Sequence, residues 1–433
     1  MELLTLGSFL VVLVVCVATG VPTAIALIVG LALFCLYAWR TGNPAGRVAA
    51  MCWHGIRPIT RILGMLVTVG VLTGLWRASG VIPAIVAYTV PFITPQLFLL
   101  MTFLLSCLVS VLTGTSFGTA ATMGAICISI ASSMGVPLVL AGGAALSGAF
   151  FGDRWSPIST SALLVASITE TDFYGNLRNM VRTAIAPFIL SCVVYLVAGM
   201  LVPAASTAAD TAGALAAAFD LSSVVLIPPA VVFVLAFARM DILLVIVAGI
   251  LSAVPLCLFV QGMDVAEVAR TAVMGFTAPT PATAALAGGG IASMLSAVEI
   301  VVITSAYAGI FEETDLLRGI EGIVARLAAR LSPFATTLVI SAAASAISCN
   351  QTLAIMLTHQ LSRDLAPAVD HALDLEDSVV LVAGLVPWSI AGGVPLASMG
   401  APVESMACAV FLYAVPLCRL AFGRLARVRA KRA

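Results

Sequence analysis

The sequence predicts an all-α polytopic membrane protein with about 10–12 membrane segments, because each span requires roughly 20 apolar residues. Of the 433 residues, 61% are hydrophobic and only 9% are charged, whereas an ordinary soluble domain carries about 25% charged residues. The apolar runs are continuous, as in Phe9–Ala18 and Ile242–Val260, which indicates helices and not the alternating strands of an outer-membrane barrel. These observations exclude a soluble protein.

The chain begins with two apolar runs that we expect to form a helical hairpin. No basic segment precedes the first run, and Gly20-Val21-Pro22 leads directly into the second, so a cleaved signal peptide is not expected. Basic residues gather in the short segments Arg40–Arg61 and Arg318–Arg330 and in the tail from Arg424 to Arg432. Since basic loops mark the cytoplasmic side, both termini are predicted to be cytoplasmic, in an inner (cytoplasmic) membrane.

A linker is expected near the middle of the chain. Pro203–Asp220 is rich in Ala, Thr and Ser, contains two Asp and has no Lys or Arg, which suits an external segment. The predicted organisation is a first transmembrane half over 1–202, an external linker over 203–220 and a second transmembrane half over 221–433.

Clusters of Gly, Ser, Thr and Pro interrupt the apolar runs of both halves. Thr113–Thr119 and Gly152–Pro157 interrupt the first half. Ser348–Thr352 follows an apolar run in the same way, and Glu376-Asp377 with Pro387-Trp388-Ser389 is expected to correspond to Gly152–Pro157. Such breaks are tolerated at membrane depth only where protein or a wet cavity satisfies the freed backbone groups. Paired breaks predict a secondary transporter with two inverted repeats and broken helices or re-entrant hairpins.

Asp153 is the strongest candidate for a transport site, because it follows an apolar stretch and precedes a run of hydroxyl side chains that includes Ser156, Ser159 and Thr160. A carboxylate at membrane depth is costly and usually faces a cavity or a partner. The functional interpretation is a cation or proton site. The alternatives are a structural ion pair or a helix cap at the membrane boundary.

Hydroxyl and amide side chains near the two breaks are candidates for completing a sodium site with Asp153. Hard cations take oxygen ligands, and ordinary packing of small residues between membrane helices is the alternative. These candidates are Thr115, Ser116 and Thr119 in the first half and Asn350, Gln351 and Thr352 in the second.

Three further charged residues have two interpretations each. Glu299 stands between apolar residues and is a candidate proton carrier, or else a residue that reaches the interface. Asp377, with Glu376 before it, is a candidate site residue or a cap of the helix that follows. Arg154 is a candidate clamp for a substrate carboxylate or the partner of a structural ion pair.

Several other functions are not expected. The net charge is zero and no basic stripe is present, so nucleic acid is not a predicted partner. The chain has no GxSxG, HExxH or P-loop motif, and Phe150 replaces the first Gly of the signature of intramembrane aspartyl proteases. We expect no enzyme activity and no cofactor beyond Na⁺ or H⁺, with a small ion or molecule as substrate and the lipid bilayer as partner.

Two long motifs resemble the NhaC family of sodium/proton antiporters. They are Gly114–Thr119 and Ser147–Ser159, which are similar to that family's Gly-Thr/Ser-Ser-Trp-Gly-Thr and Ser-Gly-Ala-Tyr-Phe-Gly-Asp-Lys-x-Ser-Pro-x-Ser segments. Leu375–Ser378 and Val386–Ser389 look like its Leu-Glu-Asp-Ser and Pro-Trp-Asn segments. The likeness covers roughly Gly64 to Leu417. It implies a sodium/proton antiporter that works by alternating access, with family function at Asp153, Ser156, Ser159, Thr115, Ser116 and Asp377.

The chain departs from the family pattern at one position. Where the antiporters have Asp-Thr-Thr-Asn, this sequence reads Thr160-Ser161-Ala162-Leu163 and so lacks a carboxylate. The leading hypothesis is an antiporter in which a cavity carboxylate exchanges H⁺ for Na⁺. The alternative is a sodium- or proton-coupled transporter of an amino acid or small organic acid in the same family. Such carriers are often homodimers, and we expect the same here.

Overall fold

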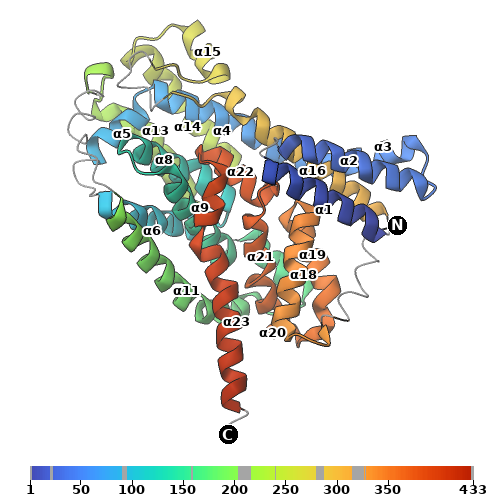
Figure 1. The fold of residues 1–433 in the computed structure, drawn as a ribbon. Coiled ribbons are helices and arrows are strands. Elements are labelled where there is room, and N and C mark those ends of the chain that lie inside the picture. Colours follow the sequence, from blue (N-terminus) through green and yellow to red (C-terminus); the bar gives the residue numbers. More distant parts are fainter. Residues whose placement is uncertain are drawn as a thin grey trace.

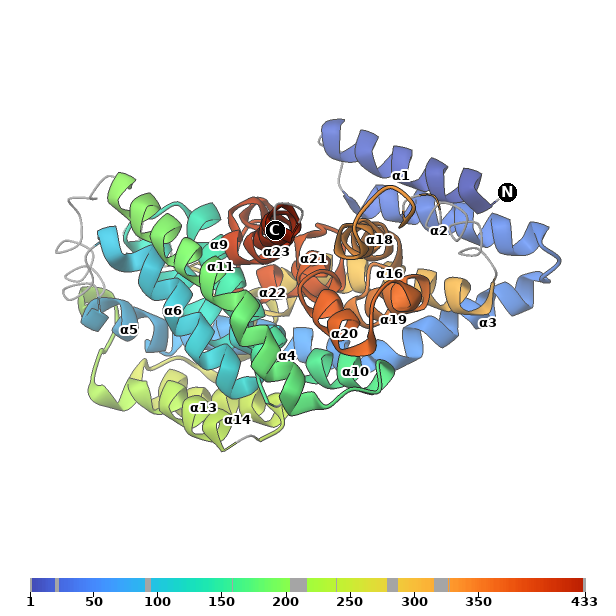
Figure 2. The ribbon, with the colours of Figure 1, turned by 90° about the horizontal axis from the view of Figure 1, so that it is seen from below.

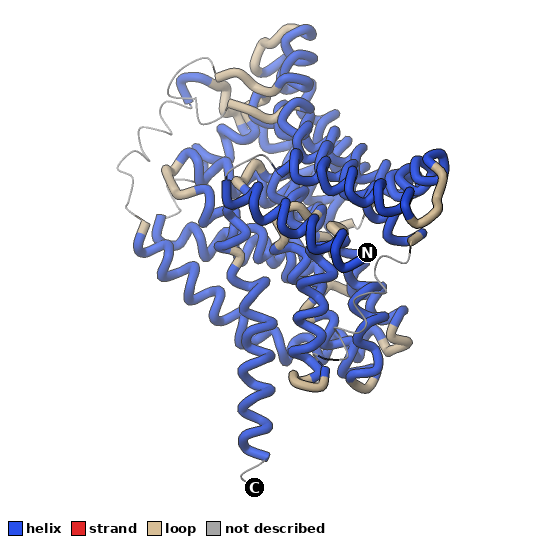
Figure 3. Tube along the Cα trace, turned by 45° about the vertical axis from the view of Figure 1, so that its right-hand side comes forward, coloured by secondary structure: helices blue, strands red, loops and turns tan. Residues whose placement is uncertain are grey.

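The computed structural model describes residues 2–19, 23–89, 95–157, 159–202, 216–238, 240–278, 287–314, 326 and 328–430. Over these ranges the chain is helical and forms no strand (Figure 3); the β-type pairing there is an isolated bridge between Phe276 and Gly288. The predicted all-α fold is confirmed.

The helices are mostly apolar and differ widely in length. In chain order they are α1 (Glu2–Thr19), α2 (Thr23–Arg40), α3 (Ala45–Ile56), α4 (Thr60–Ala78), α5 (Val81–Thr89), α6 (Pro95–Thr113), α7 (Ser116–Thr119), α8 (Ala125–Ser133), α9 (Leu138–Trp155), α10 (Thr160–Ile168), α11 (Phe173–Leu201), α13 (Ile227–Phe237), α14 (Ile242–Pro255), α15 (Val265–Met274), α16 (Leu295–Glu313), α18 (Pro333–Ser348), α19 (Gln351–Ser362), α20 (Ala368–Glu376), α21 (Val379–Val382), α22 (Ile390–Met399) and α23 (Val410–Ala430).

The described helices include enough apolar segments for a polytopic membrane protein. By length and composition, five can cross a membrane: Ser116–Ser133, Phe173–Leu201, Leu243–Val260, Ile291–Phe311 and Val403–Ala421. A sixth is the pair Ala368–Leu385 and Ile390–Met399, which is bent by 55°. Five shorter apolar helices of 10–17 residues accompany them. These helices support the predicted all-α polytopic membrane protein, and the figure of 10–12 segments stays a prediction.

The helices fall into groups on either side of the C-terminal part of the chain. Figure 2 shows α6, α9 and α11 on one side of α23 and α18, α19 and α20 on the other. The first three helices pack with α16 at one edge of the molecule, and α1 and α2 lie against each other as the predicted hairpin requires (Figure 1). The largest buried apolar cluster includes Phe103 of α6, Phe150 of α9 and Phe411 of α23.

The chain breaks in the same way in each half. Gly114 ends α6 with φ 66°, and Cys349 ends α18 with φ 55°, so both adopt the left-handed conformation that glycine favours. Each is followed by an extended N-cap residue, Thr115 with φ −146° and ψ 130° and Asn350 with φ −138° and ψ 131°. A new helix then begins at once. The correspondence expected between the two clusters is therefore present in the backbone.

A second break also recurs. Ser159 caps α10 by accepting a hydrogen bond from Ala162 N, and Ser389 caps α22 by accepting one from Ala391 N, both at 3.2 Å. Each Ser ends a Pro-x-Ser segment. The acidic pair was expected to correspond to Gly152-Asp153, and this was wrong. Asp153 precedes its Ser by six positions at the end of α9, whereas Asp377 precedes its Ser by twelve, at the end of α20.

Within the first half, α6 and α9 run parallel and very close together. A Cβ atom on Gly148 would lie 2.5 Å from Ser106 Cβ, and one on Gly152 would lie 2.1 Å from the carbonyl carbon of Ser110. Later residues of α9 thus meet later residues of α6. Small residues permit this approach, as is usual between membrane helices.

The equivalent helices of the second half are also parallel. Ser341 of α18 donates to Ser378 Oγ at 2.9 Å, and Trp388 Nε1 donates to the carbonyl of Ala346 at 2.8 Å. Later residues of α18 thus meet residues further along the segment from α20 to α22.

The two halves cross in opposite directions. Gly384, directly after α21, packs on the Phe150 ring, whereas Arg154, one turn after Phe150, reaches back to Asp377. The segment Ala368–Leu385 is therefore antiparallel to α9. Because α6 runs with α9 and α18 runs with α20 and α21, α18 is also inverted relative to α6. This is the arrangement of an inverted repeat.

Several predictions fall on residues outside the description. They include most of the 203–220 linker, much of the basic segment Arg318–Arg330 and the last residues of the tail. The division into halves at 1–202 and 221–433 therefore stays a prediction, although the recurring breaks lie in the halves to which it assigns them.

Candidate functional site

The carboxylate of Asp153 lies where the two broken segments meet. Asp153 is near the end of α9 and is buried. Its Oδ1 accepts a hydrogen bond from Ser116 N at 3.4 Å, and its Oδ2 accepts one from Gln351 Nε2 at 3.2 Å. Ser116 is the first residue of α7 and Gln351 the first of α19. The first residue of one helix in each repeat thus donates one hydrogen bond to this carboxylate.

The second-half break is held in place by its own hydrogen bonds. Gln351 Nε2 also donates to the carbonyl of Val380 at 2.9 Å. Asn350 Oδ1 accepts from Thr352 N at 2.9 Å, which caps α19. Asn350 is half-buried, whereas Thr352 is exposed. Of the three candidates in this segment, Gln351 is the one that contacts Asp153.

The first-half break places hydroxyl groups close together. Thr113 Oγ1 and Thr119 Oγ1 are 3.2 Å apart, and Thr119 Oγ1 donates to the carbonyl of Thr115 at 3.0 Å. Ser116 and Thr119 are buried. In the described ranges, no three His, Cys, Asp or Glu side chains are grouped to hold a metal ion. A sodium ion bound at Asp153 would therefore depend on neutral oxygen atoms for its other ligands.

The serines after Asp153 support the backbone. Ser161 Oγ donates to the carbonyl of Asp153 at 2.7 Å, and Ser159 Oγ donates to the same atom. Ser156 Oγ donates to the carbonyl of Val111 at 2.6 Å. The last carbonyls of a helix have no partner within it. Ser159 and Ser161 supply one at the end of α9, and Ser156 supplies one in the last turn of α6. Thr160 is exposed.

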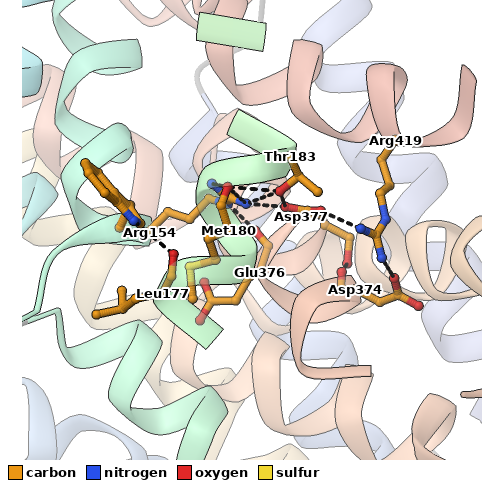
Figure 4. A network of polar contacts seen from close by, with 10 residues as sticks. Arg154, Leu177, Met180, Thr183, Asp374, Glu376, Asp377 and Arg419 are labelled. Carbon is orange, nitrogen blue, oxygen red and sulfur yellow. Dashed lines mark hydrogen bonds and ion pairs between the residues drawn. The ribbon is translucent and has the colours of Figure 1, made fainter. Parts of the chain in front are cut away.

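Arg154 is fully buried and occupied by partners from other helices, as Figure 4 shows. One terminal nitrogen contacts Asp377 Oδ1 and donates to Thr183 Oγ1 at 2.8 Å. Its Nε donates to the carbonyl of Glu376 at 3.3 Å, and both terminal nitrogens lie 3.4 Å from the carbonyl of Met180. In this conformation the guanidinium forms an ion pair with Asp377. This is the second of the two interpretations of Arg154 given by the sequence, the first being a clamp for a substrate carboxylate.

A second arginine continues this network toward the surface. Arg419 of α23 forms an ion pair with Asp374 at 2.7 Å and approaches Asp377 Oδ2 at 3.5 Å (Figure 4). Asp377 thus lies between two guanidinium groups and also accepts from Thr183 at 3.0 Å. Asp377 follows the last residue of α20, so the sequence-based interpretation of a cap for the next helix does not describe its contacts.

Glu376 is a buried acid that sequence analysis did not include among the site residues. Its side chain is fully buried, and neither carboxylate oxygen has a hydrogen-bond partner in the described part of the chain. Arg154 Nε donates to its backbone carbonyl, and Asp377 follows it in the chain. The Leu-Glu-Asp-Ser motif could have pointed to Glu376. It was used to predict a role for Asp377 only, and Glu376 was interpreted as part of a helix cap.

Acidic groups outnumber basic ones in this connected region. Two arginines face four carboxylates, so complete ionisation leaves an excess of negative charge in a buried setting, which is costly unless protons or cations neutralise it. The basic residues are Arg154 and Arg419, and the acidic residues are Asp153, Asp374, Glu376 and Asp377.

Glu299 does not join this site. It is exposed on the surface of α16. The apolar residues beside it in sequence do not bury it, because α16 turns that position away from its neighbours. Its role as a proton carrier stays a prediction.

A cavity of about 800 Å³ reaches the outer end of the charge network. Residues of α11, α18, α20 and α23 line it, including Thr183, Asp374 and Arg419. Arg182 and Arg330 also line the wall and are exposed. The buried ion pairs therefore have a polar route toward the surface.

Comparison with known proteins identifies the family of this chain. A model of the Na⁺/H⁺ antiporter family matches residues 2–172 and 148–423. The chain is 31% identical over 401 residues to the malate-2H⁺/Na⁺-lactate antiporter of Bacillus subtilis (strain 168), which covers 89% of this chain and 86% of that protein. It is 29% identical over 386 residues to the Na⁺/H⁺ antiporter NhaC of Alkalihalophilus pseudofirmus, with coverage of 86% and 82%. It is also 29% identical over 361 residues to the arginine/ornithine antiporter ArcD of Halobacterium salinarum, with coverage of 79% and 73%. The chain therefore belongs to the Na⁺/H⁺ antiporter family.

Proposed function

We propose that this protein exchanges sodium for protons by alternating access and that the two ions compete for the carboxylate of Asp153. The observation that carries the proposal is the position of this group. It is buried and hydrogen-bonded to Ser116 of α7 and Gln351 of α19. These residues begin half-helices from opposite repeats, so rocking of one repeat against the other alters the surroundings of Asp153 directly.

The chemistry of a buried carboxylate couples the two fluxes. Both hydrogen-bond donors to Asp153 are neutral, so the ionised form still requires positive charge. A proton or a sodium ion supplies it, and either one displaces the other. Hard cations take oxygen ligands, and hydroxyl and carbonyl oxygens of Thr115, Ser116 and Thr119 are the proposed partners of Asp153. No cofactor is proposed beyond the coupling ions.

The large cavity is the proposed cytoplasmic access route. It is lined by Cys418 and Arg419 of α23, and the basic end of the same helix follows directly in the sequence. Basic segments favour the cytoplasmic side. We extend this to both termini and to the inner membrane, and we propose a homodimer because related carriers often form one.

A second candidate function is coupled transport of an amino acid or a small organic acid. Two relatives are named for such substrates, malate and lactate in one and arginine and ornithine in the other. The chain also differs from the antiporter motif at Thr160, where the family resemblance implies a carboxylate. The loss of that carboxylate favours a cargo other than sodium alone. The organic substrate would then share the access route with the coupling ion.

Proton movement in proteoliposomes separates these functions. Vesicles containing the full chain and a pH-sensitive dye are given a pH gradient, then Na⁺, Li⁺, K⁺, and then a panel of amino acids and dicarboxylates. Proton efflux driven by Na⁺ or Li⁺ and abolished by Asp153→Asn supports the antiporter. Uptake of one organic substrate without any response to cations would overturn it.

The matched control is Glu267→Gln. Glu267 is an exposed acid on α15, remote in sequence from both breaks. Its replacement also removes one carboxylate and is expected to leave exchange unchanged. Equal loss of exchange in Asp153→Asn and Glu267→Gln would contradict a specific role for Asp153.

A further inference from the structure

Two histidines join α19 to α20 through their rings. Nδ1 of His359 lies 3.1 Å from Nε2 of His371, and the ring centroids are 5.2 Å apart. The two helices that carry them pack against each other (Figure 2). His371 is buried, whereas His359 is half-buried. Protons from the solvent can therefore reach this pair through His359.

The surroundings of His371 indicate which ring donates the hydrogen bond. Its second nitrogen, Nδ1, is buried and has no hydrogen-bond partner among the described residues. Because a buried N–H without an acceptor is costly, we assign the proton of neutral His371 to Nε2. His371 Nε2 then donates to His359 Nδ1. Neutral His359 carries its own proton on Nε2 and accepts with the lone pair of Nδ1.

A proton added to either ring disturbs this arrangement. Protonation of His359 occupies the accepting lone pair, so two N–H groups face each other unless His371 moves its proton to the buried Nδ1. Protonation of His371 places the new N–H at Nδ1, which has no acceptor in the described part of the chain, and buries a charge. The hydrogen bond between the rings is therefore stable only while both rings are neutral.

The elements packed on α19 bring little charge to the pair. Helices α10, α18 and α21 and the short helical turn Ala383–Leu385 contain no charged residue. The turn Arg363–Leu365 directly follows α19. The side chains of Arg363 and Asp364 in this turn are 64% and 94% exposed. Asp364 acts on His371 only from this hydrated position.

The charged groups on and around α20 are exposed or already have partners. Asp370, next to His371 in the chain, is exposed, and Asp374 forms an ion pair with Arg419 at 2.7 Å. Glu376 lies more than one turn beyond His371. Where α11 meets α20, the titratable side chains of α11 are exposed, and they are Tyr174, Arg178 and Arg182. Among the described residues, neither imidazole forms an ion pair with a carboxylate.

The imidazole pair lies between the large cavity and the candidate site. Leu365, Pro367 and Asp370, which precede His371 in the chain, line that cavity. At its other end α19 begins with Gln351, which donates to Asp153 at 3.2 Å. Helix α19 has 12 residues and no break, so displacement of its later half also displaces Gln351.

We propose that His359 and His371 form an acid-sensitive latch, which holds α19 on α20 while both rings are neutral and releases it when a ring is protonated. Released imidazoles bind protons with the ordinary histidine pKa of about 6.5, whereas the closed pair disfavours them. The open state is therefore stabilised relative to the closed state as the pH falls below about 6.5. This inference adds acid regulation to the proposed exchange and rests on that exchange only where transport is measured.

Amide hydrogen exchange of the full chain in detergent tests the latch without transport. Protection of peptides from α19 is compared at about pH 7.5 and about pH 5, on either side of the ordinary histidine pKa, after correction for the intrinsic exchange rate. Protection is expected to fall by up to about tenfold per pH unit below 6.5, as linkage to one proton requires. Unchanged protection of α19 would overturn the proposal. An equal fall in α14, which packs on α4 and α13, would indicate unfolding of the whole protein and would also overturn it.

Two substitutions retain the hydrogen bond and cannot be protonated. His371→Gln keeps an amide N–H near the position of Nε2, and His359→Asn keeps an amide oxygen near the position of Nδ1. The protein with both substitutions is expected to protect α19 equally at both pH values. His54→Gln is the control, because it removes the exposed histidine of α3 and is expected to lose protection in α19 as wild type does. A fall in the double variant as large as in wild type would overturn the proposal.

Transport shows whether the latch acts on the site. Na⁺-driven proton movement is measured across a range of pH in proteoliposomes with wild type and with the double variant. Both proteins contain Asp153, so a difference between their profiles reports the imidazole pair. Wild type is expected to lose exchange at a higher pH than the double variant, because release of α19 displaces Gln351 from Asp153.

The proposed function and this inference fail in different ways. Coincident acid limbs in the two pH profiles would overturn control of exchange by the latch. If neither protein exchanges Na⁺ for protons at any pH, sodium/proton exchange itself is wrong, and hydrogen exchange of α19 still decides whether the latch opens in acid.

Discussion

Asp153 and Gln351 connect the two halves of the chain through one side-chain amide. Gln351 Nε2 lies 3.2 Å from Asp153 Oδ2 and 2.9 Å from the carbonyl of Val380. The same nitrogen thus ties the carboxylate at the end of α9 to α21 of the opposite repeat. A hydrogen bond that favours the ionised carboxylate also sets how readily the group releases a proton.

Replacing Gln351 by Leu is expected to move the pH profile of exchange toward alkaline pH. Asp153 then loses one of its two donors and holds its proton more firmly. A hydrogen bond to a charged group contributes about 1.5–3 kcal/mol, which corresponds to roughly one to two pH units. The measurement is Na⁺-driven proton movement in proteoliposomes across a range of pH. Gln360→Leu, the same substitution at an exposed position of α19, should leave the profile in place, and an equal shift in both variants would refute the role of Gln351.

Replacing Arg154 by Leu is expected to destabilise the protein strongly. The substitution leaves Asp377 buried with a neutral donor, Thr183, and with the more distant cation Arg419 at 3.5 Å. Loss of one member of a buried ion pair costs about 3–5 kcal/mol. Thermal unfolding in detergent measures the change. Arg363→Leu removes an exposed arginine whose contact with Asp364 is 4.0 Å, where about 0–1 kcal/mol is at stake. Similar unfolding temperatures for both variants would contradict the role assigned to Arg154.

Much of the architecture was predictable because local sequence determines it. Clusters of Gly, Ser, Thr and Pro marked the breaks, and the backbone does break at Gly114 and at Cys349. That Cys349 itself adopts the left-handed conformation was not predictable, because no local rule places a cysteine there. The paired breaks predicted two inverted repeats, but which residues of the two halves meet, such as Arg154 and Asp377, was visible only in the structure.

The site was less predictable because burial is decided by distant helices. Glu299 and Glu376 both stand beside apolar residues, yet the first is exposed and the second is fully buried. The packing of other helices on α20, among them α10, α11 and α18, separates them. Ser156 and Ser159 were candidate site residues because they follow Asp153 and match the family motif. In the structure their hydroxyls donate to backbone carbonyls, and a role in ion binding stays a prediction.

Replacing Gly114 by Ala is expected to slow exchange by about tenfold. A residue with a Cβ atom at φ 66° is strained by about 1–2 kcal/mol. We expect the backbone to relieve this strain by moving Ser116 N away from Asp153. If the strain energy appears in the barrier to exchange, it corresponds to roughly a tenfold change in rate. Gly42→Ala is the control, because Gly42 also has a positive φ, 96°, and a Cβ atom there meets nothing within 4 Å. The transport rate per folded protein is measured. Equal rates in the two variants would mean that strain at the break does not affect the site.

Cys418 offers a test of the access route with the natural side chains. It is half-buried and lines the cavity beside Arg419, whereas Cys349 is fully buried at the second-half break. A membrane-impermeant thiol reagent is expected to modify Cys418 in inside-out vesicles and to leave Cys349 unmodified, as read from the peptides by mass spectrometry. In right-side-out vesicles Cys418 is expected to be protected, and Cys418→Ser removes the signal.

The side of the membrane from which Cys418 is labelled shows to which side the cavity opens. Asp374 and Arg419 line the cavity, and Arg419 also contacts Asp377. A reagent that enters the cavity therefore reaches the residues that contact the buried Asp377. Modification from the inside only, accompanied by slower exchange, supports a cytoplasmic route to the site. Modification from the outside only would reverse the assignment of sides, and with it the predicted cytoplasmic location of the C-terminus, because Cys418 and the basic end of α23 belong to one continuous helix.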